Sequence, residues 1–190
     1  SVNSTIYCGA TPHFIDIEEK TLGVDCLKLN KYLEKISIRR NNKCINKKTG
    51  RIVKAIIVLH TFGHSADLKN LVKLCKKYKI TLIEDAAEAI GSFYKKKHLG
   101  TFGKIGILSF NGNKTISSGG GGAILTNDKK LATRARYLIS NAKLNHKWKY
   151  SYSEVGYNYR LSNLNAALGY LQLKYLKKIL NQKRDLFKRY

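Results

Sequence analysis

The 190-residue sequence contains no methionine, a single proline (Pro12) and 12 acidic residues against 36 Lys and Arg. Charged residues interrupt every apolar run before it reaches the ~20 residues of a membrane-spanning helix. The first residues also lack the basic and apolar regions of a secretory signal, so we expect a cytoplasmic protein. Because the initiator methionine is absent, we expect the sequence to be part of a longer protein. With 43% hydrophobic and 25% charged residues, the composition is that of a globular domain and excludes collagen-like and disordered classes.

The sequence also lacks a recognisable metal or redox motif. Its cysteines, Cys8, Cys26, Cys44 and Cys75, form no C-x-x-C pair, which argues against a zinc ribbon and favours reduced thiols. His60 and His64 are four residues apart, but Gly63 interrupts the segment and no third ligand is evident. We expect these histidines to be structural or to contact substrate, and we expect no bound metal.

Positive charge is the most prominent compositional feature. The formal net charge of +24 raises nucleic acid as a partner, because clustered basic residues neutralise phosphates. However, 28 of the basic residues are Lys and only 8 are Arg, whereas base and bidentate phosphate recognition favour Arg. The lysines are scattered and, with 15 Asn and 18 Ile, indicate a codon bias toward A and T. We therefore expect no nucleic-acid partner; a basic nucleic-acid-binding protein is the competing class.

Apolar periodicity predicts strands alternating with helices, hence an α/β fold with a mostly parallel sheet flanked by helices. Strands are expected at 13–16, 55–59, 80–83, 105–110 and 123–126. Four helices are expected, from Asp25, at 68–75, at 129–142 and from Ser162. The first should turn inward Leu27, Leu29, Leu33 and Ile36. The last should carry one apolar stripe, made of Leu164, Leu168, Leu171, Tyr175 and Ile179. Residues 39–51 are expected to form a loop. No linker divides the chain, and its length predicts one domain.

Carboxylates gather where one expected strand ends. In open α/β sheets, ligands bind beyond the carboxyl ends of the strands. The segment 82–88 holds Glu84, Asp85 and Glu88, three of only 12 acidic residues. Asp85 is either the N-cap of a following helix or a carboxylate that pairs with the cationic ring nitrogen of a cofactor. Spacing alone does not choose between these two interpretations.

Lys114 is isolated in a neutral stretch. Residues 105–127 contain this one charged residue, where about six are expected from the overall composition. Desolvation favours the neutral, nucleophilic amine that Schiff-base chemistry requires, whereas the alternative is a lysine on an exposed turn. A nucleoside-triphosphate loop is excluded because Gly106 is followed by Asn111 and Gly112 where the motif needs Gly and Lys. The glycines at 119–122 indicate backbone close to a ligand or another chain, or a flexible turn.

A second polar segment precedes Ser162. Tyr157, Asn158 and Arg160 offer hydrogen-bonding side chains just before this expected N-cap. The segment is either a helix entry or a contact loop for an anionic group.

Taken in order, four segments resemble the sugar aminotransferases of the DegT/DnrJ/StrS family, fold-type I enzymes that depend on pyridoxal phosphate. These segments are Glu84-Asp85-Ala86-Ala87-Glu88-Ala89, Gly100-Thr101-Phe102-Gly103, Ser109-Phe110 with Lys114 and the glycines at 119–122, and Gly156-Tyr157-Asn158-Tyr159-Arg160. The resemblance extends over nearly all 190 residues and is strongest to the branch that acts on UDP-linked 4-keto-6-deoxy sugars. It implies that residues 1–190 are part of the large catalytic domain, without its N-terminal part and without the small C-terminal domain.

The resemblance also implies roles for individual residues. Lys114 would hold the cofactor covalently and then act as the base, and Asp85 would pair with the pyridinium nitrogen. Ser109 would bind the cofactor phosphate, and Asn158 would reach the cofactor of the neighbouring subunit in a homodimer. Arg160, with Tyr157, would contact substrate. Glu88 stands where the family usually has Gln near the ring hydroxyl, and Lys104 replaces a usual Asp.

The activity implied by the resemblance is transfer of an amino group, with glutamate as the expected donor. The acceptor would be a keto group of a nucleotide-linked sugar used in cell-surface polysaccharide or glycan synthesis. Lys114 argues against the dehydratase relatives, which carry His at this position. A non-catalytic or regulatory relative of the same fold is the alternative within the family.

Overall fold

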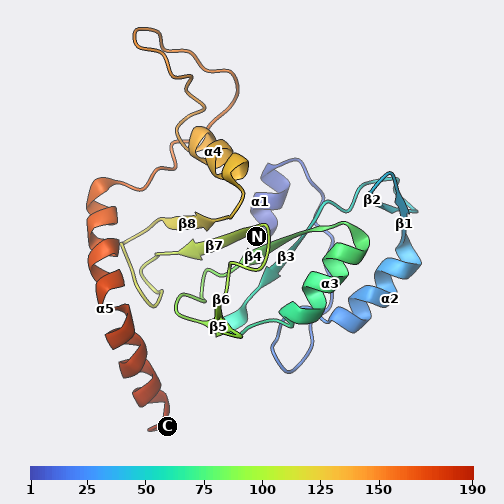
Figure 1. Ribbon diagram of the computed structural model, residues 1–190, viewed down its shortest axis with the longest axis horizontal. Helices are drawn as coiled ribbons and strands as arrows, with labels where there is room; N and C mark the ends of the chain where they lie inside the picture. Colours follow the sequence, from blue (N-terminus) through green and yellow to red (C-terminus); the bar gives the residue numbers. More distant parts are fainter. The chain divides into compact units, whose positions relative to one another are not determined.

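The computed structural model describes the whole chain, Ser1–Tyr190, which divides into two compact units, Ser1–Leu108 (unit 1) and Ser109–Tyr190 (unit 2) (Figure 1). Unit 1 contains α1 (Val2–Tyr7), α2 (Cys26–Ile36), β1 (Ser37–Arg40), β2 (Lys43–Asn46), β3 (Ala55–Leu59), the 3-10 turn η1 (Thr61–Gly63), α3 (Leu68–Tyr78), β4 (Thr81–Asp85), β5 (Phe93–Tyr94), β6 (Lys97–His98) and β7 (Ile105–Ser109), whose last residue begins unit 2. Unit 2 contains β8 (Gly122–Leu125), α4 (Lys129–Leu138) and α5 (Asn163–Phe187). None of these helices combines the length and the apolar character needed to cross a membrane.

The sheet of unit 1 brings the ends of three strands to one edge. Strand β4 lies between β3 and β7 and is parallel to both. In this register Leu59, Asp85 and Ile107 lie side by side, so the polar end of β4 is flanked by the ends of its neighbours. The parallel pairing confirms the α/β prediction.

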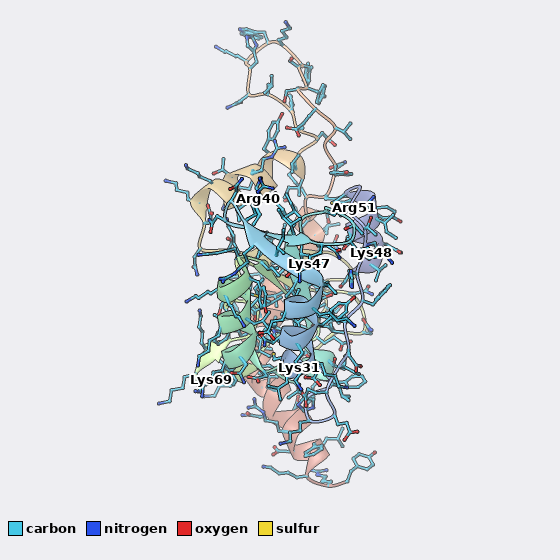
Figure 2. All side chains as sticks on the ribbon, turned by 90° about the vertical axis from the view of Figure 1, so that its right-hand side faces the viewer. Lys31, Arg40, Lys47, Lys48, Arg51 and Lys69 are labelled. Carbon is cyan, nitrogen blue, oxygen red and sulfur yellow. The ribbon has the colours of Figure 1, made fainter.

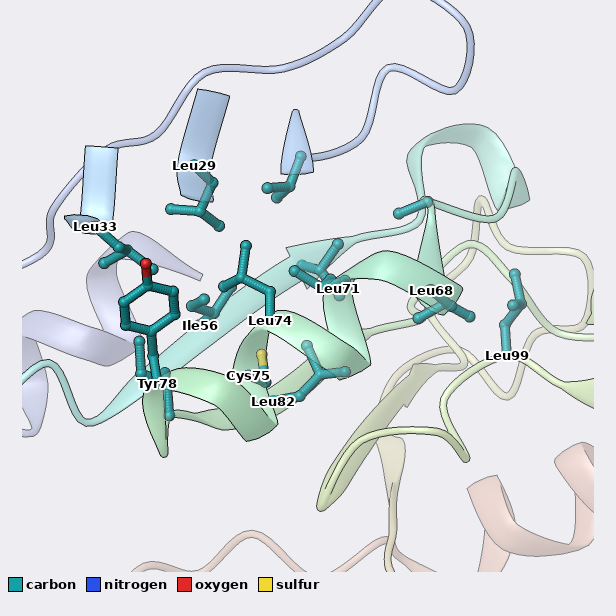
Figure 3. Close-up of a cluster of buried hydrophobic side chains, with 14 of the residues drawn as sticks. Leu29, Leu33, Ile56, Leu68, Leu71, Leu74, Cys75, Tyr78, Leu82 and Leu99 are labelled. Atoms are coloured by element: carbon teal, nitrogen blue, oxygen red, sulfur yellow. The ribbon is translucent and has the colours of Figure 1, made fainter. Parts of the chain in front are cut away.

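Helices α2 and α3 supply the core that covers this sheet (Figure 3). Asp67 caps α3 by accepting a hydrogen bond from the N–H of Asn70, and Asp25 caps α2 in the same way. Figure 3 shows the buried side chains of both helices against those of the strands, including Leu29, Leu33, Ile56, Leu68, Leu71, Leu74, Cys75, Tyr78 and Leu82. The helical periodicity predicted for both segments is thus confirmed. Leu27 is an exception: it is 79% exposed, because it lies two residues, or about 200°, from Leu29 around the helix.

Two predictions for the N-terminal half of unit 1 are wrong. Residues 39–51 are not a loop: β1 and β2 form an antiparallel hairpin in which Asn41 and Asn42 adopt left-handed φ values of 49° and 58°. Residues 13–16 are not a strand, because the only pairing nearby is a single bridge between Ile17 and Val24.

The two helices of unit 2 bury little. Ser162 caps α5 as predicted, by accepting a hydrogen bond from the N–H of Asn165. Helix α4 ends at Leu138, earlier than predicted, because Asn141 and Ala142 adopt left-handed φ values of 63° and 51°. Neither helix has a buried residue, and Leu164 in the predicted apolar stripe is 86% exposed.

The basic side chains of unit 1 project outward from α2, α3 and the β1–β2 region. Figure 2 labels six of them, Lys31, Arg40, Lys47, Lys48, Arg51 and Lys69, and all six residues are exposed. This is a solvated basic surface of the kind that a lysine-rich composition produces.

Candidate active site

The candidate residues of unit 1 lie at the carboxyl end of β4. Asp85 is half-buried there, with Oδ2 accepting a hydrogen bond from Ser1 Oγ at 2.7 Å and Oδ1 accepting one from the N–H of Ala87 at 3.2 Å. No helix begins after Asp85, since residues 86–92 form turns, so the helix N-cap interpretation is wrong. A carboxylate has about four acceptor positions. Asp85 therefore keeps acceptor capacity for a cationic ring nitrogen.

Glu84, next to Asp85, projects to the opposite face of the strand and is completely buried. Its Oε2 accepts hydrogen bonds from His60 Nε2 at 3.0 Å and from the N–H of Gly100 at 2.8 Å. Its Oε1 accepts from the N–H groups of Phe102 at 2.6 Å and Gly103 at 2.5 Å. Burial raises the pKa of the Glu84 carboxyl, but the hydrogen bonds from His60, Gly103 and Gly100 outweigh burial and hold the pKa below its ordinary value of 4.5.

His60 connects this carboxylate to the backbone beside Asp85. Its ring is completely buried, and its Nδ1 accepts a hydrogen bond from the N–H of Ala66 at 3.3 Å. This places the ring proton on Nε2, from where it is donated to Glu84. The N–H of His60 donates to the carbonyl oxygen of Asp85 at 3.1 Å. His60 is thus a structural residue, one of the two roles predicted for it, whereas His64 is exposed.

Glu88 is exposed on the turn that follows β4. Its Oε2 accepts a hydrogen bond from the N–H of Phe62 at 2.9 Å, and Phe62 adopts a left-handed φ of 52° in η1. Gly63 follows with a φ of 81°, and a Cβ there would approach the carbonyl oxygen of Glu88 to 2.8 Å. Glu88 thus helps hold the η1 turn against the segment after β4.

In unit 2, Lys114 belongs to a loop that folds back on itself. Its N–H donates to the carbonyl oxygen of Asn111 at 3.1 Å, and its side chain is half-buried, as its neutral surroundings predicted. Phe110 fixes the two ends of the loop, because its N–H donates to Gly121 at 3.0 Å and its carbonyl oxygen accepts from Ser118 at 2.9 Å. Ser109 lies immediately before the loop, and its Oγ accepts from the N–H of Asn111 at 3.3 Å.

Two of the glycines at 119–122 are required by geometry. Gly119 and Gly121 have φ values of 79° and 85°, which other residues rarely adopt. A Cβ on Gly121 would also overlap the side chain of Leu161. Helix α5 fixes the same loop, since Gln172 Oε1 accepts from the N–H of Ser117 at 2.7 Å and Asn165 donates to the carbonyl oxygen of Ser118.

The third group, Tyr157, Asn158 and Arg160, is exposed on an extended segment of unit 2. Asn158 forms a bridge with Ser140, and the rings of Tyr157 and Tyr159 stack with their centroids 5.1 Å apart. The segment is therefore held in place by its backbone while its side chains stay accessible; it leads into α5, and its use as a contact loop stays a prediction.

Two cysteines of unit 1, Cys26 and Cys75, offer no competing nucleophile. Burial raises the pKa of the Cys26 thiol to about 11 and that of the Cys75 thiol to about 12. Both thiols are protonated at neutral pH and are poor nucleophiles. All four cysteines are free thiols, as predicted.

A match to a family model joins these observations. The model of the DegT/DnrJ/EryC1/StrS aminotransferase family matches residues 1–190, the full length of the chain. The chain belongs to this family. Family membership indicates pyridoxal phosphate as the cofactor, and the candidate residues taken one by one fit it: Asp85 has acceptor capacity left, Lys114 is half-buried, and Ser109 offers a hydroxyl.

Individual relatives support the assignment. The chain is 40% identical over its whole length to EpsN of Bacillus subtilis, a protein whose description as a pyridoxal phosphate-dependent aminotransferase is provisional. It is 39% identical over 186 residues, 98% of the chain, to GDP-perosamine synthase of Escherichia coli O157:H7. The chain spans 46% of the length of each of these relatives, or about half.

A solved structure of an aminotransferase shows the same fold. It is Helicobacter pylori PseC, an aminotransferase involved in the biosynthesis of pseudoaminic acid. PseC matches with a TM-score of 0.78 and 31% identity, over 92% of this chain and 43% of PseC. The chain therefore has the fold of pyridoxal phosphate-dependent aminotransferases, as the sequence resemblance predicted.

Sequence reasoning missed the residues that hold the candidates in place. Glu84 was counted only among the carboxylates of its segment, and neither its pairing with His60 nor its contacts with residues 100–103 were predicted. Gln172 and Asn165 were read only as parts of a helix. A charged residue at a buried strand position, between Ile83 and Asp85, is the one sequence signal that marks Glu84 as unusual.

Proposed function

We propose that the protein transfers an amino group from an amino-acid donor to a keto group of a nucleotide-linked sugar. Support comes from family membership, from relatives named as sugar aminotransferases, and from the residues at the candidate site. The single observation that carries the proposal is the half-buried Lys114 on a fixed loop, because a covalent amine is the group that this chemistry cannot do without. Glutamate is the proposed donor.

Each candidate residue has a proposed task on one shared cofactor. When bound, pyridoxal phosphate supplies an electron sink for the carbanion formed at the amino-bearing carbon. Asp85 would keep the ring nitrogen protonated by pairing with it. Lys114 Nζ would hold the cofactor covalently until the amino group of the donor displaces it. The freed amine would then remove the proton from the amino-bearing carbon of the donor and later return a proton to the acceptor carbon. The donor is left as a keto acid and the sugar keto group becomes an amine, so the exchange is balanced.

Ser109 and the backbone beside it are proposed to bind the cofactor phosphate. Glu88 is proposed to lie beside the ring hydroxyl, where its acidic oxygens differ from the amide that the family usually carries. Its hydrogen bond to Phe62 gives the carboxylate a fixed direction.

The exposed segment of unit 2 is proposed to act across a homodimer. Asn158 would bind the phosphate held by the neighbouring subunit, and Arg160 with Tyr157 would contact the anionic or sugar part of the substrate. Accessible side chains on a backbone fixed by the Ser140 bridge support this proposal. We place the enzyme in the cytoplasm, with a role in polysaccharide or glycan synthesis.

Cofactor binding by the purified protein tests the proposal. Incubation with pyridoxal phosphate should produce a visible absorption band that Lys114→Ala abolishes together with transamination. Lys104→Ala is the matched control, because Lys104 is an exposed lysine that follows Gly103 and is expected to leave the band unchanged. A band that persists in Lys114→Ala, or transamination by that variant, would refute the proposal. Retention on heparin that collapses with rising salt, without any band, would favour nucleic-acid binding.

A further inference from the structure

Glu84 forms a buried network that the proposed function does not use. It is completely buried, and its four hydrogen bonds come from His60 and from the backbone N–H groups of Gly100, Phe102 and Gly103. A buried carboxylate is tolerated only when it is fully hydrogen-bonded, and this one is. The arrangement therefore joins three separate segments: β4, the end of β3 and the loop 100–103.

The loop lies unusually close to the strands on the Glu84 face. Gly106 stands opposite Glu84 in the β4–β7 register, and a Cβ on Gly106 would overlap the carbonyl oxygen of Gly100. A Cβ on Gly103 would come within 2.7 Å of the carbonyl oxygen of Leu82. Both glycines allow an approach that other residues would block, so the loop is pressed onto the sheet at the position of Glu84.

His60 carries this anchoring to Asp85. His60 Nε2 donates to the Glu84 side chain at 3.0 Å, and the backbone N–H of His60 donates to the carbonyl oxygen of Asp85 at 3.1 Å. Side chains alternate along a strand, so Glu84 is fixed on one face while Asp85 faces the other. Fixing Glu84 and the carbonyl of Asp85 therefore limits rotation of the backbone from which the Asp85 carboxylate projects.

We propose that Glu84, together with His60, is a positioning residue that holds Asp85 in the orientation needed to pair with the cofactor ring nitrogen. This inference rests on the proposed function. Asp85 itself has only two hydrogen bonds, from Ser1 and Ala87, to fix its carboxylate, so its direction depends on the strand that carries it.

The test compares Glu84→Gln with Leu74→Ala in the purified protein. The glutamine side chain places an amide N–H₂ where one carboxylate oxygen accepts two of the four hydrogen bonds, which opens the network while the size of the side chain is kept. Leu74 is a buried core residue of α3 and takes no part in these hydrogen bonds, so Leu74→Ala controls for loss of stability. Asp85→Asn shows how complete loss of the proposed pairing with the ring nitrogen changes the absorption band.

Glu84→Gln should weaken binding of pyridoxal phosphate about tenfold, the scale on which orienting partners act at metal sites. It should also shift the visible absorption band in the same direction as Asp85→Asn, by a smaller amount. Without cofactor, hydrogen exchange should show that the amides of Gly100, Phe102 and Gly103 lose protection in Glu84→Gln but not in Leu74→Ala. If Glu84→Gln does not accumulate as folded protein, Glu84→Asp, which keeps the carboxylate, should show the same changes to a smaller extent.

The outcomes separate the two proposals. If the wild-type protein shows no Lys114-dependent band, the proposed function fails and the positioning role fails with it. If the wild type and Asp85→Asn behave as expected but Glu84→Gln or Glu84→Asp matches Leu74→Ala in affinity and band position, only the positioning role is overturned. In that case Glu84 contributes to stability alone.

Discussion

Unit 1 and unit 2 hold their candidate residues in different ways. In unit 1, Asp85 sits at the end of a strand inside a sheet whose hydrophobic cluster lies wholly within residues 1–108. In unit 2, Lys114 sits on a loop fixed by hydrogen bonds, and neither α4 nor α5 buries a residue. The comparison teaches that the position of Asp85, the proposed partner of the ring nitrogen, depends on packing of the core, whereas the position of Lys114 depends on loop geometry.

The largest expected effect comes from adding a methyl group at Gly106 in unit 1. A methyl group there would overlap the carbonyl oxygen of Gly100, which is backbone and cannot move aside. Gly106→Ala should lower the free energy of unfolding by about 4 kcal/mol or more. Gly112→Ala in unit 2 is the control, because a Cβ there meets nothing within 4 Å, and urea denaturation should find a change within about 0.5 kcal/mol. Similar midpoints for the two variants would contradict the close approach of residues 100–103 to the sheet.

The second prediction concerns the core itself. Leu71 is fully buried in α3, whereas Leu164 in α5 is 86% exposed. Leu71→Ala should reduce stability by about 3 kcal/mol through lost burial and the cavity left behind. Leu164→Ala should change it by less than about 0.5 kcal/mol in the same denaturation assay. A comparable loss for Leu164→Ala would show that α5 is buried in solution and would remove the contrast between the units.

Acid should weaken unit 1 through Glu84. Because the folded pKa of Glu84 lies below 4.5, its contribution to stability is complete above that value and is lost as pH falls through the folded pKa. At pH 7, the free energy of unfolding of Glu84→Gln should therefore be about 3 kcal/mol lower than that of the wild type. This difference between the two proteins should become smaller as the pH falls.

Glu154 in unit 2 provides the control for the acid prediction. Its pKa is also lowered, by the hydrogen bond from Arg134, but the pair is exposed to solvent. Thermal unfolding of Glu154→Gln at pH 3 to 7 should therefore differ far less from wild type. An equal dependence on pH for the two variants would contradict the importance of the buried network.

The smallest expected effect lies in the glycine loop of unit 2. Gly121→Ala would place a methyl group on a residue with a φ of 85°. The methyl group would also overlap the side chain of Leu161, which can shift. We expect a loss of about 1–2 kcal/mol, the scale of a left-handed residue that carries a Cβ. Gly120→Ala, where a Cβ meets nothing within 4 Å, is the matched control in chemical denaturation. No difference between the two variants would mean that the loop is not held at this position.

The elements with a clear apolar pattern could be predicted from the sequence, and the interactions between distant segments could not. β3 was found because its apolar residues form a continuous run, and α3 because its apolar residues recur at the helical period. The β1–β2 hairpin was missed because its strands are largely polar, although Asn41-Asn42 is a turn signal for a two-residue hairpin loop. The His60–Glu84 pair joins residues 24 positions apart, which no local pattern reveals.

The candidate residues were found by contrast with their surroundings. Lys114 is conspicuous as one charge among neutral residues, and Asp85 as one of few acids at a strand end. The roles of Ser109, Glu88, Asn158, Arg160 and Tyr157 follow from the family resemblance and stay predictions.

The central claim is that one of the 28 lysines carries the chemistry. The most direct test is to incubate the protein with pyridoxal phosphate, reduce it with borohydride and map the modified peptide by mass spectrometry. The account predicts one stoichiometric phosphopyridoxyl adduct, on Lys114. Modification spread over many surface lysines, or a single adduct at another lysine, would contradict it.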